Sequence, residues 1–192
     1  WQGSSPLHLG SLGRLNEQKN YAALIRAIGL FFENAPQRRG SLRVSLAGDG
    51  PLHASLQSLI DQLDLNDTIT LTGHQSDPDA FLLTLDAYIQ PSLYEGMCLA
   101  AHEAMAMGLP VIATPVGELA HSIIKGRTGF VINQPVEKSI AAIVEDIFIQ
   151  PGRLEQYGRA GRTFVHTKFS VENFHAAGFA VLERIRTLLP QS

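Results

Sequence analysis

The sequence has little cysteine, little charge and no long hydrophobic run. Cys98 is the single cysteine among 192 residues, which excludes an intramolecular disulfide and a cysteine-based zinc cluster and leads us to expect a reducing, cytoplasmic setting. Charged residues make up 17% of the chain, too few for a disordered solvating chain or a coiled coil. No apolar run approaches the roughly 18 residues of a membrane span, and no charged segment typical of a signal peptide precedes the first apolar run.

The charge balance narrows the function classes further. The chain carries 15 basic and 18 acidic residues, a net charge of −3, whereas a dedicated nucleic-acid-binding domain is usually basic, so no nucleic acid is expected as a partner. The apolar fraction of 45% suffices for the hydrophobic core of one domain. Because the chain has no initiator Met and enters a predicted strand almost at once, we expect it to be a piece of a longer protein.

Short apolar runs alternate with longer helical patterns along the chain. The short runs predict six strands, over residues 7–12, 42–47, 68–72, 87–90, 111–114 and 129–132. The longer patterns predict helices over residues 20–32, 52–63, 77–84, 99–107, 118–124 and 154–168, from 136 to a break at 151–152, and from 170 onward. Strands separated by helices favour an α/β fold, a doubly wound parallel six-stranded sheet with helices on both faces.

The C-terminal part of the chain is predicted to be a helical tail. Pro151-Gly152 separates two of its helices, and Ser170 is expected to cap the last one. The residues of the last helix that are expected to face the interior are Phe174, Ala177, Val181, Ile185 and Leu188.

Ligands of a doubly wound sheet bind beyond the carboxyl ends of its strands, so the residues that follow each strand are the candidates for a site. Arg14 and Lys19 follow the first strand, across a strand-to-helix turn. A guanidinium and an ammonium at this place can face one phosphate group, and the amides of the following helix would add their dipole. The alternative is two surface cations in a polar turn.

The stretch after the fourth strand is the richest in candidate chemistry. Glu95 falls in the predicted loop, Gly96 lets the backbone approach a ligand closely, and Glu103 lies two turns up an otherwise apolar helix. A carboxylate on such a helix is costly to bury without a partner, and the paired hydroxyls of a ribose would be a suitable one. Alternatively, Glu103 occupies the one solvated face of its helix, and periodicity leaves both interpretations open.

Several common catalytic patterns are absent from the sequence. Gly48-Asp49-Gly50 does not continue into G-x-G-x-x-G, so a nicotinamide or flavin cofactor is not expected. No serine lies in G-x-S-x-G, and the histidines have no ligand or triad spacing, so neither hydrolase chemistry nor a metal site is expected. Cys98 has no partnered base in view and is interpreted as a packing residue at a helix start.

Five segments together resemble the signature of retaining GT-B glycosyltransferases of the family 4 type. The most specific is PSLYEGMCLAAHEAMAMGLPVIATPVGE, in which Glu95 and Glu103 form an E-x7-E pattern. The others are GRLNEQKN, RVSLAGDGP, ITLTGH and KGRTGFVI, which resemble the family's G-R-L-x-x-x-K-G, V-G-D-G-P, F-x-G and D-G-x-T-G-x-L-V motifs in the same order. The similarity extends from residue 8 to residue 132, and the helical tail fits it too.

The resemblance implies one Rossmann-like, donor-binding domain over residues 1–192, which is one half of a GT-B fold. It also implies a UDP-, GDP- or ADP-sugar substrate and transfer of a hexosyl group with retention, without a metal or another cofactor. A saccharide, lipid-linked or other acceptor would bind an N-terminal domain that this chain lacks, and only through that domain would the parent enzyme associate with the inner membrane face. The isolated domain is therefore expected to bind the donor without catalysing transfer.

Roles for single residues also come from the resemblance. Arg14 and Lys19 would hold the donor pyrophosphate and stabilise the leaving diphosphate, and Glu95 would contact the sugar hydroxyls, which makes these three the catalytic candidates. Glu103 would bind the ribose. The complete set of residues expected to bind the donor is Gly13, Arg14, Lys19, Gly73, His74, Glu95, Gly96, Met97, Cys98, Leu99 and Glu103, with Gly73 and His74 at the nucleobase.

The sequence departs from the family pattern at three places near these residues. The family's E-G-F-G is Glu95-Gly96-Met97-Cys98 here, and the loss of the second glycine is expected to narrow the space beside the donor sugar. The family's G-G-x-x-E is replaced by Gly-Glu-Leu-Ala-His over residues 117–121. Asn20 replaces the glycine after Lys19. Two alternative functions stay open. One is a non-transferring GT-B relative such as a sugar-nucleotide epimerase, and the other is a module that binds nucleotide sugars without turnover.

Overall fold

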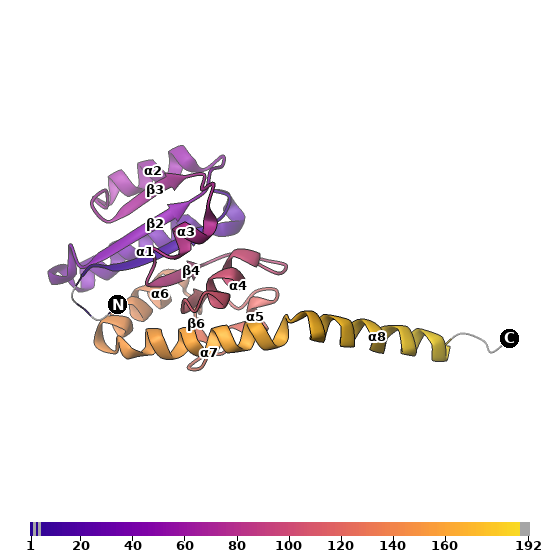
Figure 1. The fold of residues 1–192 in the computed structure, drawn as a ribbon. Helices are drawn as coiled ribbons and strands as arrows, with labels where there is room; N and C mark the ends of the chain where they lie inside the picture. Colours follow the sequence, from indigo (N-terminus) through magenta and orange to yellow (C-terminus); the bar gives the residue numbers. More distant parts are fainter. Residues whose placement is uncertain (2, 4, 189–192) are drawn as a thin grey trace.

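The computed structural model describes residues 1, 3 and 5–188, and a single parallel sheet runs through its centre (Figure 1). The strands are β1 (Leu7–Leu12), β2 (Leu42–Ala47), β3 (Ile69–Gly73), β4 (Ala87–Gln90), β5 (Val111–Ala113) and β6 (Gly129–Val131). They pair in the order β3-β2-β1-β4-β5-β6, all parallel. The predicted doubly wound α/β sheet is confirmed, with each strand within one residue of its predicted bounds.

Helices connect the strands and form the tail as predicted. They are α1 (Tyr21–Asn34), α2 (His53–Gln62), α3 (Pro78–Leu82), α4 (Leu99–Ala106), α5 (Leu119–Ser122), α6 (Val136–Ile149), α7 (Gly152–Lys168) and α8 (Val171–Leu188). Two short 3-10 turns, η1 (Glu17–Lys19) and η2 (Pro36–Arg38), were not predicted, because one turn is too short to have a recognisable period. Ser170 caps α8 as predicted, since its hydroxyl accepts a hydrogen bond from the Asn173 backbone N–H at 3.1 Å.

Each face of the sheet packs against its own hydrophobic core. Along β4, Ala87 and Ile89 point into a core shared with α1, α2 and α6, whereas Tyr88 between them points into a core shared with α3, α4 and α5. Helix α7 lies along α4. This alternation is the period of two that a strand imposes, and because both faces are covered, apolar side chains point to both sides of the central strands.

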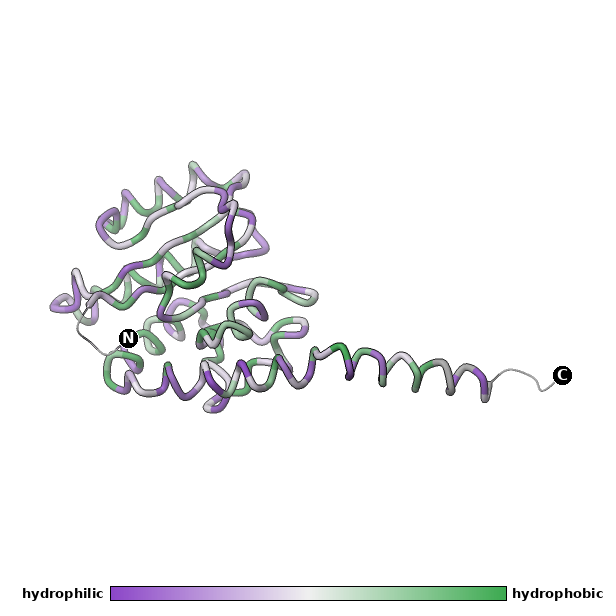
Figure 2. Tube along the Cα trace, viewed as in Figure 1, coloured by the Kyte–Doolittle hydropathy of each residue, from purple (hydrophilic) through white to green (hydrophobic). Residues whose placement is uncertain are grey.

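The last helix extends away from the sheet (Figure 1). Apolar and polar residues alternate along it (Figure 2), but every side chain of α8 that the structure describes is exposed, including Phe174 at 78% and Val181 at 57%. The prediction that this helix faces inward is wrong for Phe174, Ala177 and Val181, because no other element of the described chain lies against them; the side chains of Ile185 and Leu188 lie outside the described part. Within residues 1, 3 and 5–188, no helix is both long and apolar enough to cross a membrane.

Backbone packs directly on backbone at the carboxyl edge of the sheet. Gly48, which follows β2, has a φ of +130°, and a Cβ atom there would lie 2.0 Å from the carbonyl oxygen of Gly13. The N–H of Gly48 donates to the carbonyl of Gly73 at 2.7 Å, and the N–H of Gly13 donates to that of Ala47 at 2.9 Å. The ends of β1, β2 and β3 are therefore tied together, and only glycine fits at residue 48.

We expect Gly48→Ala to lower the free energy of unfolding by about 1–3 kcal/mol, because it adds a side chain where both the φ angle and the space forbid one. Urea unfolding measures this change. Gly152→Ala, in the first turn of α7 with nothing within 4 Å of the added methyl group, is the matched control and should not destabilise the chain. Equal stability of the two variants would contradict the packing described here.

Candidate functional site

The residues predicted to bind a ligand all lie at the carboxyl edge of the sheet or in the helix that begins there. They follow β1, end or follow β3, or belong to the loop and first turns that lead from β4 into α4. Strands β1 and β4 are neighbours in the sheet, and the chain leaves them toward opposite sides, to β2 and to β5. This is the topological switch point, where open α/β sheets have their ligand crevice.

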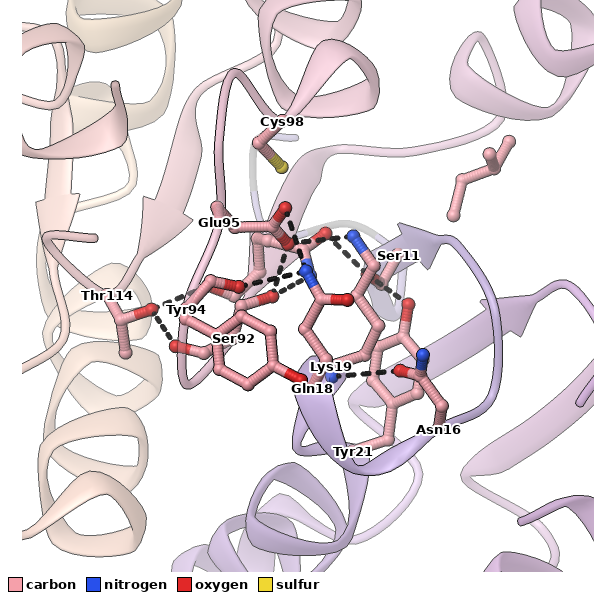
Figure 3. Close-up of polar contacts among 12 residues, drawn as sticks. Ser11, Asn16, Gln18, Lys19, Tyr21, Ser92, Tyr94, Glu95, Cys98 and Thr114 are labelled. Atoms are coloured by element: carbon pink, nitrogen blue, oxygen red, sulfur yellow. Dashed lines mark hydrogen bonds and ion pairs between the residues drawn. The ribbon is translucent and has the colours of Figure 1, made fainter. Parts of the chain in front are cut away.

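The side chains of Lys19 and Glu95 meet at this point. Lys19 Nζ lies 2.8 Å from Glu95 Oε1, and the two side chains are 15% and 6% exposed (Figure 3). Gln18 adds a second link, since its Nε2 donates to Glu95 Oε2 at 3.4 Å and to the carbonyl of Tyr94 at 3.0 Å. Two of the three predicted catalytic residues, from loops far apart in the sequence, are thus in direct contact.

An asparagine stands at each end of the short turn that carries Lys19. Asn16 precedes η1, and its side-chain oxygen accepts a hydrogen bond from the Lys19 backbone N–H at 3.3 Å. Asn20 follows with a φ of +55° and starts α1. That left-handed conformation explains why a glycine is usual at this position, and asparagine is one of the few other residues that tolerate it. The departure at Asn20 therefore leaves the turn intact.

Glu95 is also connected to a series of hydrogen-bonded polar side chains within the sheet, which we did not predict. Ser92 Oγ donates to Glu95 Oε1 at 2.7 Å, and Gln90 Nε2 donates to Ser92 Oγ at 2.7 Å. Thr114, which follows β5, donates to the Ser92 carbonyl at 2.6 Å (Figure 3). The signal available in the sequence was the placement of Tyr88, Gln90 and Ser92 two residues apart, which puts successive polar groups on one side of a buried strand.

The loop that carries Glu95 is supported from behind by the turn after β5. Gly117 has a φ of +54°, and a Cβ atom there would lie 2.3 Å from the carbonyl oxygen of Glu95 and 2.4 Å from that of Gly96. The N–H of Glu118 donates to the Gly96 carbonyl at 2.9 Å. The departure over residues 117–121 thus keeps a glycine where this contact requires one.

Cys98 is a buried packing residue beside Glu95. It belongs to the core shared with α3, α4 and α5, and its φ of +56° explains why a glycine is usual at this position. Burial, together with the negative charge of Glu95, raises the pKa of the Cys98 thiol to about 11. The thiol is thus protonated at neutral pH, which agrees with a packing role; its effect on the space beside a donor sugar stays a prediction.

Three other predicted residues project into solvent. Arg14, His74 and Glu103 are exposed, and none of them has a side-chain hydrogen bond or an ion pair with the part of the chain that the structure describes. The exposure of Glu103 matches the solvated-face interpretation of α4 and leaves its carboxylate free to accept hydrogen bonds. Met97, on the same loop as Glu95, and Leu99, the first residue of α4, are exposed as well.

His102, the neighbour of Glu103 in α4, has a structural environment. It is buried, its Nδ1 donates to the carbonyl of Cys98 at 3.0 Å, and its Nε2 lies 2.9 Å from Ser122 Oγ. These bonds tie the first turn of α4 to α5. No group of three or more His, Cys, Asp and Glu side chains in the described residues is arranged to hold a metal ion.

Comparison with known proteins adds an independent result. The profile of the family described as glycosyl transferases group 1 matches residues 4–164. The D-inositol 3-phosphate glycosyltransferase of Pseudarthrobacter chlorophenolicus is 28% identical over 181 residues, which are 88% of this chain and 43% of that enzyme. The chain thus spans about two fifths of the length of this relative.

Solved structures are similar to nearly the whole chain. The C-terminal domain of the group 1 glycosyl transferase LpcC from Francisella tularensis superposes with a TM-score of 0.75 and 22% identity, covering 87% of this chain and 89% of that domain. Anabaena HepE, solved in complex with UDP and glucose, superposes with a TM-score of 0.80 and 20% identity over 93% of this chain and 49% of HepE. The predicted fold, one Rossmann-like half of a GT-B enzyme, is therefore confirmed.

We expect Cys98 to react slowly with iodoacetamide, because at pH 8 a thiol with a pKa near 11 is about one-thousandth thiolate, against roughly a quarter for an ordinary cysteine. The rate should keep rising about tenfold per pH unit up to pH 10. The same chain in concentrated urea is the control, and its rate of reaction should level off near pH 8.5. A native rate that also levels off near pH 8.5 would contradict the raised pKa.

Proposed function

The chain belongs to the group 1 glycosyl transferases, and on this premise we propose that it binds the nucleotide-sugar donor of a retaining enzyme of the GT-B, family 4 type. The observation that carries the proposal is the meeting of Lys19 and Glu95 at the switch point between β1 and β4. A cation and a carboxylate at the place where an α/β sheet binds its ligand suit a molecule that is anionic at one end and rich in hydroxyls at the other. A nucleoside diphosphate sugar is such a molecule.

The diphosphate is assigned to Arg14 and Lys19. Arg14 is exposed and without an ion pair in the described residues, so its guanidinium is free to form two parallel hydrogen bonds to phosphate oxygens. Lys19 would exchange its contact with Glu95 for a contact with the diphosphate. As the bond to the sugar breaks, negative charge grows on the leaving diphosphate, and both cations stabilise it without the help of a metal.

The two hydroxyl-bearing parts of the donor are assigned to the two glutamates. Glu95, beside Lys19 at the switch point, would accept hydrogen bonds from the sugar hydroxyls, while Glu103, on the exposed side of α4, would accept hydrogen bonds from both hydroxyls of the ribose. Gly73 and His74 at the end of β3 would lie along the nucleobase. The backbone N–H groups of residues 96–99 and of the first turn of α4 would face the sugar and phosphate.

UDP is the first nucleotide to test, since HepE was solved with UDP and glucose. Because the chain spans about two fifths of its enzyme relative, hexosyl transfer is proposed for a protein that also contains an acceptor-binding domain. By itself this chain would bind the donor without acceptor-dependent turnover, because acceptor positioning is worth on the order of 7–11 kcal/mol. A cytoplasmic setting, with membrane contact only through the acceptor domain, is part of the same proposal.

We expect Arg14→Ala to weaken UDP binding by roughly 1.5–3 kcal/mol, or about 10- to 150-fold in Kd, because one charged hydrogen-bonding group to phosphate is lost. Isothermal titration calorimetry of this chain with UDP, GDP and ADP measures the effect and identifies the base. Arg43→Ala, at an exposed position near the start of β2, is the matched control and should bind like the unaltered chain. Equal Kd values for the two variants would reject the phosphate assignment.

We expect the two glutamates to have separable effects. Glu103→Gln should weaken UDP and UDP-glucose alike, because both ligands contain the ribose, whereas Glu95→Gln should weaken UDP-glucose and leave UDP within about twofold. Both ligands are titrated against both variants and against Glu33→Gln, an exposed glutamate of α1, as the control. If Glu95→Gln lowers the affinity for both ligands equally, the division between sugar and ribose is wrong.

A further inference from the structure

A chain of buried polar side chains lies beneath the carboxylate of Glu95. Gln90 and Ser92 are 0% and 1% exposed, and they lie among apolar residues of the central strands. Polar groups buried this deeply are costly unless each has a hydrogen-bonding partner. Here successive hydrogen bonds connect these side chains, from the middle of the sheet to Glu95.

The directions of the two hydrogen bonds nearest Glu95 follow from the charge of its carboxylate. A carboxylate only accepts, so the single proton of Ser92 Oγ is donated to Glu95 Oε1, at 2.7 Å. The Ser92 oxygen must then accept from Gln90, whose Nε2 lies 2.7 Å away. The amide of Gln90 is thereby oriented, with its Oε1 turned toward donors deeper in the sheet.

Hydroxyl groups from two neighbouring strands meet that oxygen. Tyr88 OH lies 2.9 Å from Gln90 Oε1, and Ser11 Oγ, on β1, lies 3.4 Å from it and 3.0 Å from Tyr21 OH. Burial raises the pKa of Tyr88 and of Tyr21, so both phenols keep their protons and remain able to donate. The chain of contacts is therefore anchored on both sides of the switch point.

Ser92 has a further anchor on a third strand. Thr114 Oγ1, after β5, donates to the Ser92 carbonyl at 2.6 Å, so the residue is held through β1, β4 and β5 together. Glu95 itself lies in an exposed loop next to Gly96. Lys19, its other close partner, has a long side chain, which binds the diphosphate in the proposed function. Of the two contacts to Glu95 Oε1, that with Ser92 is the one whose geometry does not depend on the ligand.

We propose that Ser92 and Gln90 are positioning residues that orient the Glu95 carboxylate toward the hydroxyls of the donor sugar, and so set how much the sugar moiety adds to donor affinity. This inference rests on the proposed function. According to this proposal, neutral residues inside the sheet determine how much more tightly the chain binds a nucleotide sugar than the nucleotide alone. A carboxylate that rotates freely keeps its charge but no longer points at a sugar hydroxyl.

The quantity that tests it is the ratio of the Kd for UDP to the Kd for UDP-glucose, measured by calorimetry on this chain. Ser92→Ala should lower that ratio about five- to tenfold and leave the Kd for UDP within about twofold. Ser45→Ala, which removes another buried hydroxyl bonded to a side chain, His8, should leave the ratio unchanged. Ser92→Cys, which keeps the volume and donates weakly, should lower the ratio by a smaller factor and serves if the alanine variant does not fold.

A double-mutant cycle separates positioning from plain structural support. In a Glu95→Ala background, Ser92→Ala should have no further effect on the ratio, because the group it orients is gone. Full additivity in the cycle, or an equal loss of UDP and UDP-glucose affinity in Ser92→Ala, would overturn the inference while nucleotide binding stands. Binding of UDP without any gain from the glucose moiety would also overturn it. Absence of UDP binding by the unaltered chain would reject the proposed function and, with it, this inference.

Discussion

The other interactions of the site are arranged around the ion pair between Lys19 and Glu95. It joins loops 76 residues apart in sequence, on the two sides of the point where the sheet changes its direction of growth. A buried carboxylate in an ion pair is costly unless further hydrogen bonds reach it. Glu95 has them from Ser92 and Gln18, and Gly117 keeps its loop at the right distance from β5. The ion pair, the buried polar side chains and the glycine turns thus meet at the switch point of the sheet.

Most of the fold could be predicted because buried parallel strands are short apolar runs between turn residues. Strand β4 is an example, with Asp86 before it and Pro91 after it. The 3-10 turns could not be predicted, since a single turn has no period. The last helix shows a different limit. Its apolar stripe indicates that a surface suits burial, but the sequence of the helix does not say what covers it, and in this structure Phe174 and Val181 are exposed.

Charged residues marked the candidate site in the sequence, whereas its neutral residues were missed. Arg14, Lys19 and Glu95 stand out as ionic residues just after strands, and the motif around Glu95 is specific. Gln90 and Ser92 read as the ordinary end of a strand, because their role depends on which way each hydrogen bond points. For Glu103, periodicity allowed two interpretations, and three-dimensional packing places the carboxylate on the exposed side of α4.

The projection of α8 from the sheet also determines how the chain loses its structure. The strands and the helices packed on them share two continuous cores, so they unfold as one cooperative unit. Helix α8 contributes no described side chain to either core, whereas most of the stability of a helix in a protein comes from packing of its apolar face. We therefore expect α8 to melt as a separate unit with its own temperature dependence, so that the helical structure of α8 is not a measure of whether the sheet is folded.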